Sequence, residues 1–246
     1  MVTSRSGGAS PRQPGQQDTV GSQPPRVRYH ARIDKAGLPG RMMRTGAKER
    51  VAQERQRVSG LSLDLYHLDA AYVSWRAGQN GLATFDIYTR TAPFAGAYMV
   101  TAGLQPALDF VREFVFSEED IAYLRATKGY DAGFLDELRA YRCSGDIDAI
   151  AEGVISFPDE PMLRVTAPFR HALLLESGLL RAVGISTLIA TKAARLVDAA
   201  AGRSVADFGY RRAQDPYLAT RSAIIGGCTS TSYVAGAAHF DVPTAG

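Results

Sequence analysis

The run from His171 to Ala201 constrains the fold of this chain more than any other segment. It is rich in apolar residues, contains no proline, and is interrupted only by Gly178 and Gly184. This pattern predicts one long helix or two abutting helices that end at Gly202. With 46% hydrophobic residues overall, the 246-residue chain can fill a sizeable core around such a segment. We therefore expect a soluble globular protein of one large domain or two small ones.

Helical and strand patterns alternate before this run. Alternating apolar residues predict a strand at 83–89, and short apolar runs between Gly and Pro after Cys143 predict several short strands up to about residue 168. Ser117 and Asp120 form a candidate capping box, in which the serine oxygen accepts a free amide and the acid reaches back. Helical spacing predicts four helices, at 61–77, 103–114, 117–126 and 132–141.

The segment after the long run ends in short elements joined by polar loops. SVADF at 204–208 is short and apolar and is followed by a glycine and two arginines. This is typical of a buried strand whose C-terminal end opens into a functional loop, as in α/β barrels. Helices are expected at 217–225 and 233–239, and a further strand is expected to begin at 240–242.

Residues 1–60 differ in composition from the rest of the chain. They hold 12 of the 28 Lys and Arg residues and 4 of the 25 Asp and Glu residues, a net charge of +8, so the remainder carries −5. We expect a disordered, basic leader rich in Pro, Gly and Gln, or a misassigned start, with a short helical run at 47–58. Binding of nucleic acid by this leader is the less favoured alternative, because only Tyr29 offers base stacking.

Several other residue types point to no site of their own. Cys143 and Cys228 lack metal-ligand spacing and are expected to be free thiols, and His67, His171 and His239 are expected to be structural. Lys192 and Arg195 share a helix face that could meet pyrophosphate or simply be solvated. The absence of a signal peptide and of about 18 consecutive apolar residues predicts a cytoplasmic protein without a membrane span.

DFGYRRAQDP at 207–216 is the most informative motif for binding. Arg211 and Arg212 at a strand end are planar, permanently charged donors for carboxylate or phosphate, and Phe208 offers a flat apolar face beside them. This combination suits an aromatic, anionic ring. The alternative is a surface arginine pair with Asp207 or Asp215 as its partner and Phe208 in the core.

GGCTSTSYVAG at 226–236 is a second candidate. Consecutive hydroxyl side chains before a helix present amides and hydroxyls at a positive helix end, where an anion can bind. Capping of the helix by Thr231 or Ser232 without any ligand is an equally good interpretation.

Four blocks together resemble nicotinate phosphoribosyltransferases, in the same order and at similar spacings. The first two blocks open with LDLYHLDAAYVSW and RCSGDIDAIAEGV. The third is LIATKAARLVDAAAGRSVADFGYRRAQDP and the fourth is GGCTSTSYVAG, and the match covers nearly all of 61–246. The resemblance implies an α/β fold with a mixed α+β N-terminal domain at 61–170, followed by the first part of an irregular α/β barrel at 171–246. It also implies a homodimer with active sites at the subunit interface.

The family's site residues can be carried over to matching positions. The aromatic residue of an early DxY motif, here Tyr66, reaches into the partner's site and stacks on the pyridine ring. The aromatic residue of the DFG-type strand end, here Phe208, stacks on the other face. The neighbouring arginine, here Arg211 with Arg212 adjoining, contacts phosphate or the nicotinate carboxylate. In the related nicotinamide enzymes an aspartate matches Ser232, and the absence of an acid at 226–236 therefore resembles the nicotinate type.

The reaction that the resemblance implies joins nicotinate to phosphoribosyl pyrophosphate, yielding nicotinate mononucleotide and pyrophosphate. ATP hydrolysis through a phosphohistidine drives it, and Mg²⁺ assists the leaving pyrophosphate. That histidine is expected just beyond Gly246, and His239 should not be mistaken for it, so the chain is expected to be inactive alone. Leu63 and Asp69 depart from the family pattern near Tyr66. The rival hypotheses are a non-catalytic dimerising fragment and a basic-tailed module that binds nucleic acid or anionic surfaces.

Overall fold

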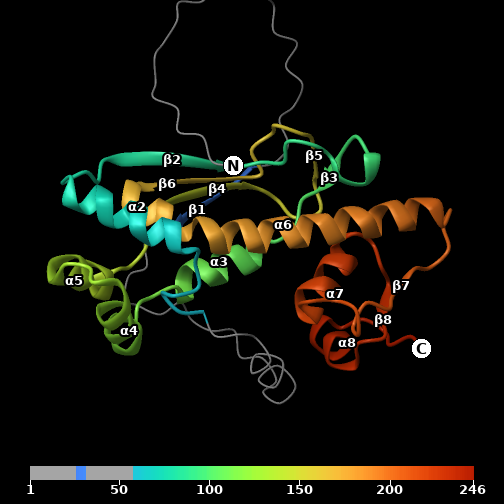
Figure 1. Ribbon diagram of the computed structural model, residues 1–246. Helices are drawn as coiled ribbons and strands as arrows, with labels where there is room; N and C mark the ends of the chain where they lie inside the picture. The colour runs from blue at the N-terminus through green and yellow to red at the C-terminus, as the bar shows by residue number, and fades with distance from the viewer. Residues whose placement is uncertain (1–25, 32–57) are drawn as a thin grey trace, which may run out of the picture.

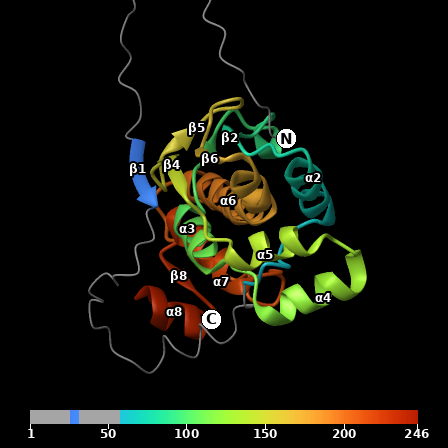
Figure 2. The same ribbon diagram turned by 90° about the vertical axis from the view of Figure 1, so that its left-hand side faces the viewer.

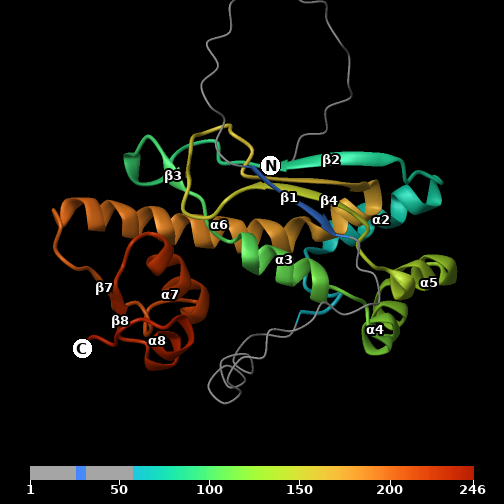
Figure 3. The ribbon, with the colours of Figure 1, turned by 180° about the vertical axis from the view of Figure 1, so that it is seen from behind.

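Helix α6 (Phe169–Ala199) is the centre of the fold. The computed structural model describes residues 26–31 and 58–246, and it mixes helices and strands throughout, which confirms the expected α/β class. α6 is one unbroken helix of 31 residues rather than two, and Figures 1 and 3 show it running along most of the length of the described part. A Cβ atom at Gly178 would lie 2.0 Å from the Phe110 ring, so this glycine permits a close approach of α3 (Leu104–Glu113). Gly184 has open space around it and interrupts nothing.

An antiparallel sheet covers one side of the N-terminal part of α6 (Figure 2). Its strand order is β1-β4-β6-β2, comprising β1 (Arg26–Ala31), β4 (Gly145–Ile150), β6 (Leu163–Pro168) and β2 (Leu82–Ile87). Alternate residues of β6 are buried, which is the pattern of a sheet with one face packed and one face solvated.

The less buried sheet face carries polar pairs. Arg164 donates two hydrogen bonds to Asp86, at 2.6 and 2.8 Å, and the hydroxyls of Thr84 and Thr166 lie 3.1 Å apart. Both pairs join β2 to β6 across the register, in which Asp86 lies opposite Arg164. Pairing across neighbouring strands stabilises the sheet on the face that the core does not cover.

Strand β1 corrects the expectation for residues 1–60. Arg26–Ala31 pairs with β4 in antiparallel register, Arg26 opposite Ile150 and Ala31 opposite Gly145, so this part of the leader belongs to the fold. The expectation of a leader that is disordered throughout is wrong at this strand, because a partner far along the chain supplies the hydrogen bonds. The helical run expected at 47–58 lies outside the described residues except for its last position.

The remaining N-terminal elements follow the expected order closely. They are α2 (Leu65–Arg76), the short helix η1 (Pro93–Ala95), β3 (Met99–Val100), α4 (Glu118–Lys128), α5 (Ala132–Ala140) and β5 (Ile155–Ser156), which pairs with β3. The capping box of Ser117 and Asp120 is confirmed, with bonds of 3.1 and 2.9 Å. The first helix begins at Leu65 rather than Leu61, because Ser59–Ser62 forms a turn.

The C-terminal part contains parallel pairing. β7 (Ala206–Asp207) pairs in parallel with β8 (Ser230–Thr231), and a parallel bridge joins Thr231 to Thr244. Helix α7 (Pro216–Ile225) connects β7 to β8, as the helix of a βαβ unit does, which is how an α/β barrel begins. The strand expected from 240–242 is wrong in its position: α8 (Val234–Phe240) includes Phe240, and the bridge forms only at Thr244.

The main hydrophobic core lies where the sheet and α2 to α5 meet the first half of α6. Smaller clusters join α6 to β3 and to the segment around α7. By length and composition α6 could cross a membrane, but half of its most apolar stretch is buried inside the protein, as in a core helix. α6 crosses the boundary expected at 170/171, so the division into two domains stays a prediction.

Candidate functional site

The expected site residues form two separate groups along α6. Tyr66 lies at the start of α2, beside the N-terminal half of α6. The other group lies at β7 and β8, beneath the C-terminal end of α6, and Figures 1 and 3 agree on this placement. Its members come from two loops that the parallel pairing brings together: Phe208, Arg211, Arg212, Thr231 and Ser232.

Tyr66 is an exposed aromatic residue with one anchored end. Its side chain is 57% exposed, its hydroxyl donates to Glu176 Oε1 at 3.2 Å, and its ring centroid lies 3.8 Å from that of His67. Partial burial raises the pKa of the Tyr66 phenol, and the charge of Glu176 and the hydrogen bond to it raise the pKa further. His67 is buried: its Nε2 lies 3.1 Å from Glu176 Oε2, and its Nδ1 lies 3.0 Å from Ser177 Oγ. These contacts connect the start of α2 to α6.

Phe208 follows directly on β7 and is 58% exposed. The expectation that 204–208 is a buried strand is therefore wrong: β7 is half-buried, and Phe208 does not belong to the core. The alternative that placed Phe208 in the core is wrong for the same reason. A large aromatic side chain at a strand end, with its face free, is available to stack on a flat ligand.

Asp207 is bound by donors from three segments. Its Oδ1 accepts the Gly209 amide at 2.8 Å, and its Oδ2 accepts the hydroxyls of Thr220 at 2.7 Å and Thr231 at 3.0 Å. Its backbone carbonyl accepts the Ser232 amide at 2.8 Å. Asp207 thus connects the turn after β7, helix α7 and the segment 229–232, called the hydroxyl loop.

Arg211 and Arg212 are exposed, on the turn that follows Phe208. Within the described part of the chain neither forms an ion pair. Asp207 is engaged as above, and Asp215 caps α7 by accepting the Leu218 amide at 3.0 Å. The alternative of an arginine pair neutralised by these aspartates is therefore wrong.

The two candidate residues of the hydroxyl loop, Thr231 and Ser232, differ in burial. Thr231 is fully buried, and its hydroxyl oxygen also accepts the Tyr233 amide at 3.1 Å, so the hydroxyl forms hydrogen bonds inside the protein. Ser232 is half-buried beside it. The following helix α8 has only seven residues, and its N-cap residue Tyr233 makes no side-chain capping bond.

A cavity of about 360 Å³ lies between α6 and β7. Of the expected site residues only Phe208 lines it, and its walls are mostly apolar side chains with Lys192 and Asp207 as the charged groups. Phe94 closes one side with an unusual left-handed backbone, φ 60° and ψ 33°. The Lys192 ammonium lies 4.8 Å from the centroid of the Phe94 ring, and the Arg195 side chain donates a hydrogen bond to the Phe94 carbonyl at 2.5 Å. The helix face that was expected to meet pyrophosphate or solvent therefore contacts Phe94.

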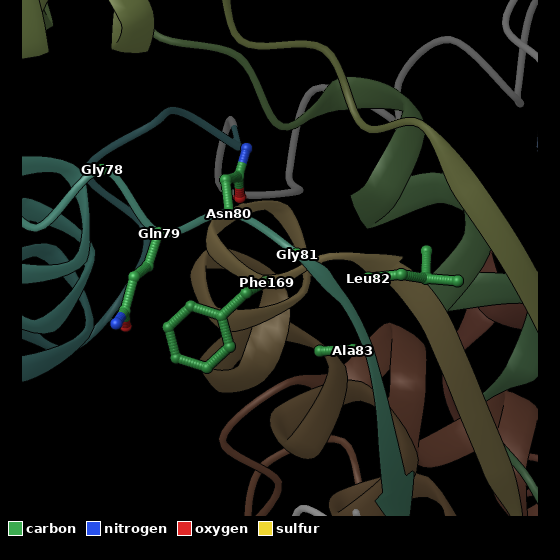
Figure 4. Close-up of a pocket in the computed structure, with 7 residues that line it drawn as sticks. All are labelled: Gly78, Gln79, Asn80, Gly81, Leu82, Ala83 and Phe169. Carbon is green, nitrogen blue, oxygen red and sulfur yellow. The ribbon is translucent and has the colours of Figure 1, made fainter.

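A second cavity, of about 470 Å³, lies at the turn between α2 and β2 (Figure 4). The chain from Gly78 to Ala83 passes over the Phe169 ring there, and Gln79 and Asn80 are its polar side chains. The side-chain oxygen of Asn80 accepts the Arg170 amide at 3.0 Å. With no charged lining group, this cavity offers little to an anionic substrate.

A partly buried ion pair connects the two halves. Arg221 of α7 donates to both oxygens of Glu152 at 2.7 and 2.6 Å, and Glu152 also accepts the amides of Gly103 and Leu104 at the start of α3. Burial by itself raises the pKa of the Glu152 carboxyl. The bonds and charge of Arg221 and the two amides outweigh burial, and the pKa lies below its ordinary value. The pair fixes α7 against the N-terminal part.

The described residues contain no cluster of His, Cys, Asp and Glu side chains that could hold a metal ion. Both cysteines are buried free thiols, as expected. His171 packs on Tyr141, and His239 contacts the Tyr217 hydroxyl at 2.9 Å. These contacts agree with the structural role expected for the histidines.

The sequence interpretation missed Asp207, Glu152 and Phe94 as residues that shape this region. The adjacency of Asp207 to Phe208 was a signal, but its hydroxyl partners come from α7 and β8 and are not recognisable from spacing. Nothing in the sequence pairs Glu152 with Arg221, and no motif indicates the left-handed conformation of Phe94.

Comparisons with known proteins identify relatives of this chain. Residues 61–184 match the family model of the nicotinate phosphoribosyltransferase (NAPRTase) N-terminal domain. The matched segment ends inside α6. A nicotinate phosphoribosyltransferase of Mycobacterium tuberculosis is 37% identical over 195 residues, 78% of this chain and 42% of that protein. That of Bacillus subtilis is 37% identical over 190 residues, 76% of this chain and 39% of that protein. The chain thus spans about two fifths of the length of these curated relatives.

Solved structures give the same result. The crystal structure of human nicotinic acid phosphoribosyltransferase has a TM-score of 0.69 and 35% identity, covering 75% of this chain and 38% of that one. The nicotinate-nucleotide pyrophosphorylase of Pyrococcus furiosus shares the fold, with a TM-score of 0.59 at 22% identity over 84% of this chain and 44% of that one. With half of the chain matched by the family model, this chain belongs to the nicotinate phosphoribosyltransferase family.

Proposed function

We propose that this chain forms part of a cytoplasmic enzyme that condenses nicotinate with phosphoribosyl pyrophosphate to nicotinate mononucleotide, with ATP hydrolysis, in NAD biosynthesis. Relatives named as nicotinate phosphoribosyltransferases support the reaction class. The chain's own contribution is the part of the site that holds the nicotinate ring.

The observation that carries this proposal is the exposed Phe208 at the end of β7, followed by the exposed Arg211 and Arg212, which form no ion pair with any residue that the structure describes. A free aromatic face fixes the plane of a ring, and a guanidinium binds a carboxylate or phosphate with a defined direction. Nicotinate carries both an aromatic ring and a carboxylate. The nearby Ser232 adds a polar group without negative charge, whereas an acid at this position would repel the substrate carboxylate.

The position of Tyr66 supports a site shared between two subunits. Tyr66 binds Glu176, whereas Phe208 lines the cavity with Lys192. At 1.5 Å per residue, α6 rises about 24 Å between Glu176 and Lys192. The two aromatic side chains of one chain are therefore too far apart to enclose one ring. In a homodimer, Tyr66 of one subunit can face Phe208 of the other.

The phosphate chemistry is assigned to no residue here. Mg²⁺, when bound, would supply positive charge to the leaving pyrophosphate, and none of the described residues is assigned to hold it. His239, the histidine nearest the end of the chain, is engaged with Tyr217 and is not proposed to be phosphorylated.

The test is calorimetric titration of the chain with nicotinate, together with sedimentation to determine its oligomeric state. We expect binding of nicotinate in preference to nicotinamide, and binding weakened about fivefold or more in both Tyr66→Ala and Phe208→Ala, because each variant loses about 1 kcal/mol or more of ring stacking. A mixture of the two variants should recover part of the binding, because each heterodimer has one intact site. Absence of nicotinate binding by the wild-type chain would refute the proposal, and absence of recovery from confirmed dimers would place Tyr66 outside the partner's site.

A further inference from the structure

The two segments expected to contact nicotinate are joined through one carboxylate. Phe208 and Arg211 lie on the turn after β7, and Ser232 lies on the loop after β8. Asp207 receives the Gly209 amide from the first segment and the Thr231 hydroxyl from the second. Its backbone carbonyl receives the Ser232 amide, which adds a second connection between the same segments.

These donors occupy both oxygens of the Asp207 carboxylate. Oδ1 accepts the Gly209 amide, whereas Oδ2 accepts two hydroxyls, from Thr231 and from Thr220 of α7. Both threonines are fully buried, so their hydroxyls face Asp207 rather than solvent. The carboxylate is thus directed into the protein, although it lies next to an exposed aromatic residue.

We propose that Asp207 is a positioning residue of the nicotinate site, which sets the separation between the Phe208 ring and Ser232. The inference rests on the proposed function and extends it. Nicotinate can stack on Phe208 and present its carboxylate to the hydroxyl loop only if both segments keep one distance, and small errors in such geometry are costly. Asp207 supplies this fixed distance and touches no substrate atom itself.

Asparagine cannot replace the carboxylate fully. If its oxygen keeps the Gly209 amide, its NH₂ group faces the hydroxyls of Thr220 and Thr231, which now donate to Asp207. Both hydroxyls would have to turn and accept instead. Asp207→Asn is therefore an isosteric variant that loosens the loop connection, and Asp207→Ala removes all three side-chain bonds.

The experiment uses the complete chain. Calorimetry measures the affinity of nicotinate and of nicotinamide for the wild type, Asp207→Ala, Asp207→Asn and the control Asp215→Asn. Asp215 lies in the same segment and caps α7 through Leu218, but binds neither candidate segment. We expect Asp207→Ala to weaken nicotinate more than tenfold, Asp207→Asn about threefold to tenfold, and both to reduce the preference for nicotinate over nicotinamide. Asp215→Asn should stay within twofold of the wild type.

Amide hydrogen exchange provides a readout that does not depend on a ligand. Asp207→Ala should speed exchange around Gly209 and Ser232 together, whereas Asp215→Asn should affect only the start of α7. Unchanged affinity and preference in both Asp207 variants would overturn the positioning role while leaving the proposed function intact. Failure of the wild type to bind nicotinate would refute both. Faster exchange in only one of the two segments would show that Asp207 does not connect them.

Discussion

The ion pair of Glu152 and Arg221 yields the most quantitative prediction. Their side chains are only 18% and 19% exposed, and the two contacts of 2.6 and 2.7 Å are bidentate. Glu152→Gln keeps the size of the side chain and an oxygen for the Gly103 and Leu104 amides, but leaves the arginine charge without its counter-ion. Removal of one partner from a fully buried pair costs about 3–5 kcal/mol. This pair is only partly buried and Glu152→Gln retains the amide bonds, so its cost should lie at the lower end, about 3 kcal/mol.

Urea unfolding followed by circular dichroism measures this effect. With a slope of about 2 kcal/mol per molar urea, a loss of about 3 kcal/mol lowers the midpoint by about 1.5 M. The control Glu113→Gln changes an exposed glutamate at the end of α3 and should shift the free energy of unfolding by less than about 0.5 kcal/mol.

A double variant tests whether the cost arises from the pair. Arg221→Met removes the charge that Glu152→Gln leaves unpaired, so the double variant should be no less stable than the worse single variant. The reasoning fails if Glu152→Gln lowers the free energy of unfolding by less than about 1 kcal/mol. It fails equally if the costs of the two single variants simply add.

Three further predictions concern other parts of the chain. Gly178→Ala should destabilise by more than about 2 kcal/mol because its Cβ meets the Phe110 ring, whereas Gly184→Ala should stabilise by up to about 1 kcal/mol, both by thermal unfolding. Phe208→Ala should leave the free energy of unfolding within about 0.5 kcal/mol, because the ring is 58% exposed, while nicotinate binding loses about 1 kcal/mol or more. Because folding lowers the pKa of Glu152, its contribution to the free energy of unfolding is complete above the unfolded pKa of 4.5 and is lost as the pH falls below that value. When the free energy of unfolding is measured against pH, it should therefore fall less steeply in acid for Glu152→Gln than for the wild type.

Features decided by neighbouring residues were predictable from the sequence. The capping box of Ser117 and Asp120 involves residues three apart, and the helix through Gly178 and Gly184 follows from apolar spacing with few breakers. The order of helices and strands from Leu65 onward follows from the same local signals.

Features decided by distant residues were not. β1 is a strand because β4 pairs with it, and nothing within Arg26–Ala31 announces that partner. The exposure of Phe208 could not be read from the apolar run before it, because exposure depends on which elements lie beside β7. Similarly, the roles of Asp207 as acceptor depend on hydroxyls that α7 and β8 bring to it.

Strand β1 bears directly on where the chain can be shortened. A version that begins at Gly60 keeps every described helix but removes the strand that pairs with Gly145–Ile150. The backbone amides and carbonyls of β4 that now bond to β1 would then face solvent, and an open strand edge recruits strands from other molecules. Shortened preparations should therefore self-associate through β4, and a peptide of residues 26–31 added in excess should suppress that self-association.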